Sequence, residues 1–277
     1  MAHIFRRDGG TGGIERTSFS CERDGLVIRG EQWRPQGLLP PVAIVSHGFM
    51  ANLTTVRHYA HHLAELGFAA FCFDFNGGSA LRSQSDGATT DMSVLTEVDD
   101  LLAVVSFTQE LTHVDASRML LMGCSQGGFV SALVAAQLKE QVGGLALFYP
   151  AFCIPDDARA GKMMFARFDP ADVPGTFRCG PMRLGRRYVT DVQAMDPFAE
   201  IAPYPGHVLI VQGTKDRVVD PSYATRARDS YAARTASRWP DASVELYMIE
   251  DGAHGFSRRH DRQAIAILDG FARQLLK

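Results

Sequence analysis

Ser125 is the residue whose neighbours best fit a catalytic nucleophile. It lies in Gly123-Cys124-Ser125-Gln126-Gly127, a G-x-S-x-G pattern between an apolar run and a segment with helical spacing. A serine on so sharp a strand-to-helix turn needs close neighbours without a Cβ atom, which explains the two glycines. The turn also directs the backbone N–H of Gln126 toward an anion formed on a substrate. The pattern predicts a nucleophilic serine, and a glycine-rich turn with an incidental serine is the alternative.

A serine nucleophile requires a base and an orienting acid, and two later apolar runs are each followed by a suitable residue. Asp216 follows the run His207–Val211, and His254 follows the run Val244–Ile249. Catalytic groups of open sheets gather at the carboxyl ends of the strands. The sequence therefore predicts that Ser125, Asp216 and His254 form a catalytic triad.

Two other aspartates compete with Asp216 for the role of the acid. Asp220 directly precedes Pro221 and is better placed to cap the following helix. Asp251 is too close to His254 in the sequence to face it easily. We therefore expect Asp216 to orient the histidine.

The segment Ser46-His47-Gly48-Phe49 predicts the second half of an oxyanion hole. It follows the apolar run Val42–Ser46, and the backbone N–H of Phe49 is the expected partner of the N–H of Gln126. His47 precedes the nucleophile's strand, so we expect it to brace the loop rather than act as the base. Three further histidines have helical spacing, but no acid or cysteine cluster accompanies them, so no metal site is predicted; these are His58, His61 and His62.

Alternating strands and helices must position these residues, and the sequence shows that alternation. Short apolar runs are typical of strands buried on both faces, and they predict an α/β fold with a mostly parallel sheet covered by helices on both faces. The predicted strands are Val42–Ser46, Phe68–Phe75, Arg118–Met122, Gly144–Tyr149, His207–Val211 and Val244–Ile249. The predicted helices are Thr54–Leu66, Val94–Phe107, Gly127–Leu138, Ser222–Ala236 and His260–Leu276.

Local patterns refine this scheme at two places. The first 40 residues indicate a loose tail and then an antiparallel edge hairpin, because Thr17–Glu22 and Leu26–Trp33 flank an Asp-Gly turn. The helix Val94–Phe107 carries three acids early in its length, where the helix dipole favours negative charge; they are Glu97, Asp99 and Asp100.

Residues 151–205 interrupt the alternation. They contain scattered proline and glycine, show no sustained period and include seven aromatic residues. A structureless loop of this length is uncommon inside a compact domain. We predict a single domain over residues 1–277, with residues 151–205 inserted as a lid or small subdomain.

Composition excludes several classes of protein. The 277 residues carry 28 Lys+Arg and 31 Asp+Glu, a net charge of −3, which leaves no basic footprint for nucleic acid. No apolar run is long enough to span a membrane, and the first residues lack the apolar core of a secretory signal. The Cys count is odd, and three of the five cysteines lie in or beside apolar runs, which favours reduced thiols in a cytoplasmic protein; these are Cys72, Cys124 and Cys153.

The sequence resembles those of the α/β-hydrolase superfamily, and within it those of the bacterial feruloyl (cinnamoyl) esterases. The resemblance runs from about Thr17 to the end of the chain. It is carried by His47-Gly48-Phe49, Phe73-Asp74-Phe75-Asn76-Gly77, Ser125-Gln126-Gly127-Gly128, Gly213-Thr214-Lys215-Asp216 and Gly252-Ala253-His254. It implies an α/β-hydrolase fold and a serine esterase that needs no cofactor.

The resemblance also implies a substrate and two residues that bind it. In that family an inserted lid holds the phenolic ring of a hydroxycinnamate, and an aspartate and a tyrosine of the lid bind the ring hydroxyl. Asp157, shortly after Pro150-Ala151, matches that aspartate, and Tyr188 matches the tyrosine. A phenol entering an apolar pocket needs an acceptor, which a carboxylate provides. The alternatives are that Asp157 caps a lid helix and that Tyr188 is a core residue.

The chain departs from the family pattern at positions near this site. Cys124 stands where the family has a histidine, and Met164 stands where a lid glutamine joins the phenol contacts. We expect a small aromatic ester as the substrate and no nucleic-acid or membrane partner. The sequence allows a monomer or a homodimer. A general short-chain carboxylesterase, a serine peptidase or an acyltransferase of the same fold are the alternative functions, and a non-catalytic receptor of this fold is a further one.

Overall fold

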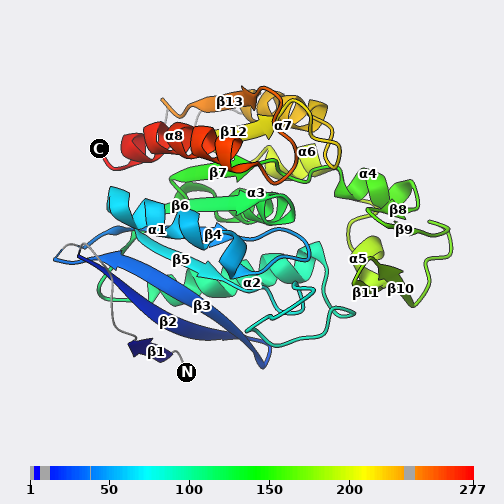
Figure 1. Ribbon diagram of the computed structural model, residues 1–277, viewed down its shortest axis with the longest axis horizontal. Coiled ribbons are helices and arrows are strands. Elements are labelled where there is room, and N and C mark those ends of the chain that lie inside the picture. Colours follow the sequence, from blue (N-terminus) through cyan, green and yellow to red (C-terminus); the bar gives the residue numbers. More distant parts are fainter. Residues whose placement is uncertain (1–2, 7–12, 38, 234–240) are drawn as a thin grey trace.

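The computed structural model describes residues 3–6, 13–37, 39–233 and 241–277. Within these residues one large sheet contains the following strands: β1 (His3–Arg6), β2 (Ile14–Arg23), β3 (Leu26–Pro35), β4 (Pro41–Ser46), β5 (Ala69–Phe73), β6 (Asp115–Cys124), β7 (Gly144–Phe148), β12 (His207–Gly213) and β13 (Val244–Ile249). Their order across the sheet is β1-β2-β3-β5-β4-β6-β7-β12-β13 (Figure 1). The pairs from β1 to β5 are antiparallel and those from β5 to β13 are parallel.

Helices cover both faces of this sheet, as the alternation predicts. The helices are α1 (Arg57–Leu66), α2 (Val94–Gln109), α3 (Gln126–Leu138), α7 (Ser222–Ala232) and α8 (Arg258–Leu275). The buried side chains of α1 and α8 share one apolar cluster, and those of α2, α3 and α7 share another. Successive side chains of a strand point to opposite faces, so neighbouring residues of β4, Ala43 and Ile44, enter different clusters. The predicted mostly parallel sheet with helices on both faces is confirmed.

The N-terminal hairpin is also confirmed, but the chain before it differs from the prediction. Asp24 and Gly25 have φ angles of 52° and 80°, as a tight two-residue hairpin turn requires. Part of the expected loose tail, His3–Arg6, pairs with β2 as an edge strand. A run of four residues is too short for its alternation to be distinguished from a loop. The remaining tail residues, 1–2 and 7–12, and the predicted helical residues 234–236 lie outside the described part of the chain.

The three acids early in α2 have different surroundings. Asp99 is exposed, but Glu97 and Asp100 are buried. Asp100 accepts hydrogen bonds from Arg23 and from the backbone and side chain of Asn76. Glu97 accepts one from the side chain of Gln126. Glu97 lies in the first turn of α2, as predicted, and both buried acids in addition bind side chains of other elements.

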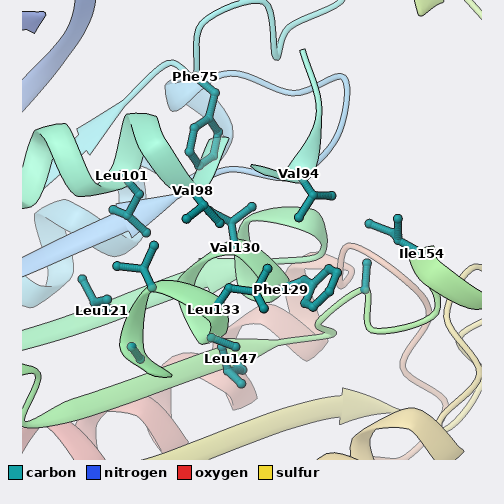
Figure 2. Close-up of a cluster of buried hydrophobic side chains, with 14 of the residues drawn as sticks. Phe75, Val94, Val98, Leu101, Leu121, Phe129, Val130, Leu133, Leu147 and Ile154 are labelled. Atoms are coloured by element: carbon teal, nitrogen blue, oxygen red, sulfur yellow. The ribbon is translucent and has the colours of Figure 1, made fainter. Parts of the chain in front are cut away.

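The chain between β7 and β12 folds into short elements, which lie at one end of the molecule except for α6, which lies beside α7 (Figure 1). They are α4 (Ile154–Arg159), β8 (Lys162–Met163), β9 (Ala166–Arg167), β10 (Thr176–Cys179), β11 (Met182–Gly185), α5 (Arg187–Thr190) and α6 (Pro197–Ile201). Apolar side chains of this insertion belong to the same buried cluster as α2 and α3. Figure 2 shows Ile154 of the insertion in that cluster with Phe129 of α3 and Val94 of α2.

Two polar contacts also join the insertion to the segment before α2. Thr89 Oγ1 donates to the carbonyl of Arg183 at 2.5 Å, and Ser93 Oγ donates to Asp191 at the same distance. Among the helices that the structure describes, none is long and apolar enough to cross a membrane.

Candidate active site

Ser125 occupies a strained turn between β6 and α3. Its φ and ψ are 53° and −121°, a conformation that non-glycine residues rarely adopt and that marks functional turns. A Cβ on Gly123 would lie 2.2 Å from the carbonyl oxygen of Gly127, and a Cβ on Gly127 would lie 2.2 Å from that of His47. Both glycines are therefore required by close packing of the backbone, as the pattern predicts.

The structure brings the side chains of Ser125, His254 and Asp216 into one hydrogen-bonded line. His254 Nε2 lies 2.9 Å from Ser125 Oγ, and His254 Nδ1 lies 2.8 Å from Asp216 Oδ2. An ionised carboxylate only accepts hydrogen bonds, so Nδ1 carries the hydrogen and Nε2 is free to accept from the serine hydroxyl. This geometry is suited to removing the serine proton.

Asp216 is held as an ionised acceptor in the connection after β12. Burial by itself would raise its pKa, but hydrogen bonds from His254 and from the backbone N–H groups of Val219 and Val218 hold the pKa of Asp216 below its ordinary value. Gln212 donates a further bond to Oδ2 at 2.9 Å. The carboxylate is thus fixed from several directions, which in turn fixes the ring of His254.

The two competing aspartates do not approach His254 with their side chains. Asp220 accepts from the backbone N–H of Ser222 at 2.9 Å, at the start of α7. Asp251 is exposed and pairs with Lys215 at 2.6 Å. Both contacts agree with the preference for Asp216.

Sequence reasoning missed two residues of this arrangement. Gln212 is a buried polar residue that directly follows the apolar run Val208–Val211 of β12, and that change is a signal that could have identified it. The ring of Tyr149 lies 4.9 Å from that of His254, at an angle of 64°, and supports the imidazole edge-on. Tyr149 directly follows β7 and carried no comparable signal.

The backbone N–H groups of Phe49 and Gln126 are the candidate oxyanion donors. Gln126 is the first residue of α3, where N–H groups have no partner within the helix. In the described part of the chain neither N–H has an acceptor. His47 braces this loop, as expected, because its Nδ1 donates to the carbonyl of Gly48 and its Nε2 accepts from the N–H of Phe75. Burial lowers the pKa of His47, which suits a neutral ring that accepts.

A cavity of about 340 Å³ opens at Ser125 and extends beneath the insertion. Asp157 and Tyr188 both line it, together with apolar side chains. Asp157 lies in the first turn of α4, whose N-cap is Cys153, so it does not cap that helix. Its carboxylate pairs with Lys162 at 3.0 Å. The neighbouring Asp156 does not line the cavity and accepts instead from the hydroxyl of Tyr223.

Tyr188 lines the cavity and is also nearly fully buried. Its hydroxyl donates to Gln126 Oε1 at 2.6 Å, and its ring stacks on that of Phe49 with 5.2 Å between the ring centres. Tyr188 is therefore a core residue, which was one alternative from the sequence, and it also lines the cavity.

A second cavity, of about 400 Å³, also reaches Ser125. It includes His254, which does not line the first cavity, whereas Gln126 lines only the first. Polar side chains of α1 and α8 contribute to this second cavity, among them His58, Tyr59, Arg258 and Asp261.

The positions that depart from the family pattern have simple environments. Cys124 is buried, and burial raises its pKa to about 12, so its thiol is not a nucleophile. All five cysteines are free and buried. Met164 lines the first cavity at the turn between β8 and β9 and is half exposed.

The histidines of α1 pair with acids rather than with one another. His58 lies 3.3 Å from Asp261, and His62 contacts Asp269, both on α8. Among the described residues, no group of three or more His, Cys, Asp or Glu side chains is arranged to hold a metal ion. These histidines contribute instead to the contact between the two helices on this face.

Comparisons with known proteins give similarities to several hydrolases. The family described as serine aminopeptidase, S33 matches residues 41–175. The monoglyceride lipase of Mus musculus is 24% identical over 253 residues, which cover 81% of this chain and 79% of that protein. A solved structure of ferulic acid bound to Est1E from Butyrivibrio proteoclasticus superposes with a TM-score of 0.81 at 24% identity, covering 93% of this chain and 99% of that one. Acetyl xylan esterase 1 from a Thermoanaerobacterium species superposes with a TM-score of 0.67 at 18% identity, covering 100% and 88%.

Proposed function

We propose that this chain, an α/β-hydrolase by its fold and a hydrolase by its relatives, is a serine esterase that hydrolyses hydroxycinnamate esters. The fold expected from the sequence is confirmed by the sheet and by the superpositions. The roles of individual residues and the choice of acyl group are the content of the proposal.

The observation that carries the proposal is that one cavity contains Ser125 and Gln126 together with Asp157 and Tyr188. An aromatic acyl group bound there would have its carbonyl at Ser125 and its ring among apolar side chains such as Ile154 and Met163. A ring hydroxyl there would donate to the carboxylate of Asp157, which is a charge-assisted bond. The ferulic acid bound to Est1E, a protein of similar fold, supports this choice of acyl group.

The proposed reaction proceeds through an acyl-enzyme. Ser125 Oγ attacks the ester carbonyl while His254 Nε2 takes its proton, and Asp216 stabilises the resulting imidazolium. The N–H groups of Phe49 and Gln126 bind the oxyanion. His254 then protonates the departing alcohol, and water, activated by the same histidine, releases the acid.

The two cavities suit the two halves of an ester. His254 must give its proton to the alcohol oxygen, and it lines only the second cavity. The alcohol is therefore assigned to the second cavity and the acyl group to the first, with Ser125 at their junction.

The direct test combines a variant with a panel of substrates. Ser125→Ala is expected to lower kcat by about 10⁴- to 10⁶-fold with an unchanged melting temperature, and labelling by a fluorophosphonate should disappear. Near-normal turnover by the folded variant would refute the role of Ser125.

The substrate panel tests the acyl group separately. Methyl caffeate, ferulate and p-coumarate should be hydrolysed faster than methyl cinnamate, which lacks the ring hydroxyl. Preference for p-nitrophenyl acetate or butyrate would indicate a general carboxylesterase, and preference for a monoacylglycerol would indicate the activity named in the mouse relative. Cleavage of an aminoacyl p-nitroanilide would favour a peptidase, and transfer to an added alcohol would favour an acyltransferase.

A further inference from the structure

Gln126 has a buried side chain that is held at both ends by other elements. Its Nε2 donates to Glu97 Oε2 of α2 at 2.8 Å, and its Oε1 accepts from the hydroxyl of Tyr188 of α5 at 2.6 Å. All three side chains are at most 3% exposed. The proposed mechanism uses only the backbone of Gln126, so these contacts have no assigned purpose in it.

The structure places the amide oxygen of Gln126 toward Tyr188 and the amide nitrogen toward Glu97. In this orientation the tyrosine hydroxyl and the amide nitrogen each donate one hydrogen bond, and the amide oxygen and the carboxyl oxygen each accept one. A buried polar group that loses its partner is costly, so removing either contact should loosen the side chain of Gln126.

The same tyrosine also contacts the other half of the candidate oxyanion hole. The ring of Tyr188 stacks on that of Phe49, with centres 5.2 Å apart and planes at 30°. Glu97 is fixed in its turn by α2, whose N-cap Ser93 binds Asp191, three residues after Tyr188. The insertion, α2 and the nucleophile turn are thus connected through buried contacts at the oxyanion donors.

We propose that Glu97 and Tyr188 are positioning residues for the oxyanion hole: they clamp the side chain of Gln126 from opposite ends and so hold its backbone N–H, with that of Phe49, in place. Small displacements of oxyanion donors cost large factors in rate, because the interaction with the developing charge depends steeply on distance. This inference rests on the proposed serine hydrolase mechanism and adds a second role for Tyr188 beside the cavity lining.

The decisive substrate is p-nitrophenyl acetate, because its acyl group has no ring that could contact Asp157 or Tyr188. Tyr188→Phe keeps the stacking on Phe49 but removes the hydroxyl. It is expected to lower kcat for this ester by about 5- to 50-fold with little change in KM, since the interaction is made in the transition state. An unchanged kcat for the acetate, with a raised KM confined to hydroxycinnamates, would overturn the proposal and leave Tyr188 as a substrate contact alone.

A matched control comes from the same insertion region. Tyr204 is fully buried and its hydroxyl donates to the carbonyl of Val142 at 3.1 Å, away from both cavities. Tyr204→Phe should lower the stability of the protein about as much as Tyr188→Phe does, but it should leave kcat for p-nitrophenyl acetate unchanged. Both variants are assayed well below their melting temperatures. An equal loss of kcat in both variants would show that the effect is structural and would overturn the proposal.

Variants of Glu97 test the other end of the clamp. Glu97→Gln retains an oxygen that can accept from Gln126 and should keep most of the activity on p-nitrophenyl acetate, whereas Glu97→Leu should lose about as much as Tyr188→Phe. The double variant Glu97→Leu with Tyr188→Phe should lose less than the product of the two single losses, because both act through Gln126. Fully multiplicative losses would contradict a shared action.

These outcomes separate this inference from the proposed function. If hydroxycinnamates are not substrates, the acyl assignment fails while the acetate assay still reports on the clamp. If Ser125→Ala retains activity, the mechanism itself fails.

Discussion

At the scale of single residues, this site depends on buried groups whose protonation states are set by their surroundings. Asp216 is ionised because His254 and backbone N–H groups donate to it. Glu97 is the opposite case: burial raises its pKa well above the ordinary value of 4.5, and the hydrogen bond from Gln126 only partly offsets this. The pKa values of these two carboxyl groups are therefore shifted in opposite directions, because only Asp216 has enough donors to offset its burial.

Glu97 accordingly makes stability depend on pH. Its pKa is raised in the folded state, so the folded protein keeps a proton that the unfolded chain loses above about pH 4.5, and stability falls as pH rises from there. The negative charge of Asp100 on α2 raises the pKa of Glu97 further. Burial also raises the pKa of Tyr188, so its hydroxyl is neutral beside Glu97.

The prediction concerns the melting temperature of Glu97→Gln relative to the parent protein. The difference should be constant below about pH 4 and should shift in favour of the variant as pH increases toward 7. Thermal melts at several pH values measure it, and a difference that does not change with pH would show that Glu97 is ionised in the folded protein. Glu110→Gln, at the exposed C-terminal end of α2, is the control.

At the scale of elements, the turn between β6 and α3 leaves almost no room for side chains at its glycines. Gly127 packs against the carbonyl oxygens of His47 and Ser46, so the loop of one candidate oxyanion donor and the helix of the other are in close backbone contact. Because the backbones approach so closely here, no side chain fits at position 127.

Two glycine-to-alanine variants in helices should therefore have opposite effects. Gly127→Ala would place a Cβ 2.2 Å from a backbone oxygen and is expected to destabilise the protein by about 3 kcal/mol or more. Gly270→Ala in α8 meets no atom within 4 Å and should stabilise by about 0.5–1 kcal/mol, because alanine is the better helix former. Denaturant unfolding compares the two, and a mild effect at Gly127 would contradict the close contact.

At the scale of the whole molecule, the insertion and the sheet share one buried core. Leu184 and Val189 of the insertion belong to the same cluster as Val98 of α2 and Phe129 of α3. The single domain with an insertion at residues 151–205 remains a prediction, and this shared cluster is the physical argument for it.

The shared core predicts that the insertion and the sheet unfold together. Thermal unfolding should be one cooperative transition, with the same midpoint by far-UV circular dichroism and by the near-UV signal of the aromatic residues, seven of which lie in the insertion. Two separated transitions, or an insertion that is cleaved by protease while the sheet remains intact, would show that the insertion is a separate folding unit.

The sequence by itself determined the parts that depend on local spacing. Backbone sterics and burial leave short-range patterns, which can be recognised in the sequence. Such patterns are the glycines around Ser125, the apolar runs of β4, β6 and β12, and the positions of Asp216 and His254 after late strands. The edge strand β1 was missed because four residues carry too little pattern.

Only the tertiary structure decided which distant side chains meet. Glu97 and Tyr188 lie 29 and 62 residues from Gln126 in the chain, and no periodicity relates them. The position of Glu97 early in its helix fits a helix dipole, and the resemblance to feruloyl esterases implies a substrate contact for Tyr188. Packing joins both side chains to one amide. Hydrogen bonds between elements depend on how faces dock, and that is fixed by the assembled core rather than by any local stretch of chain.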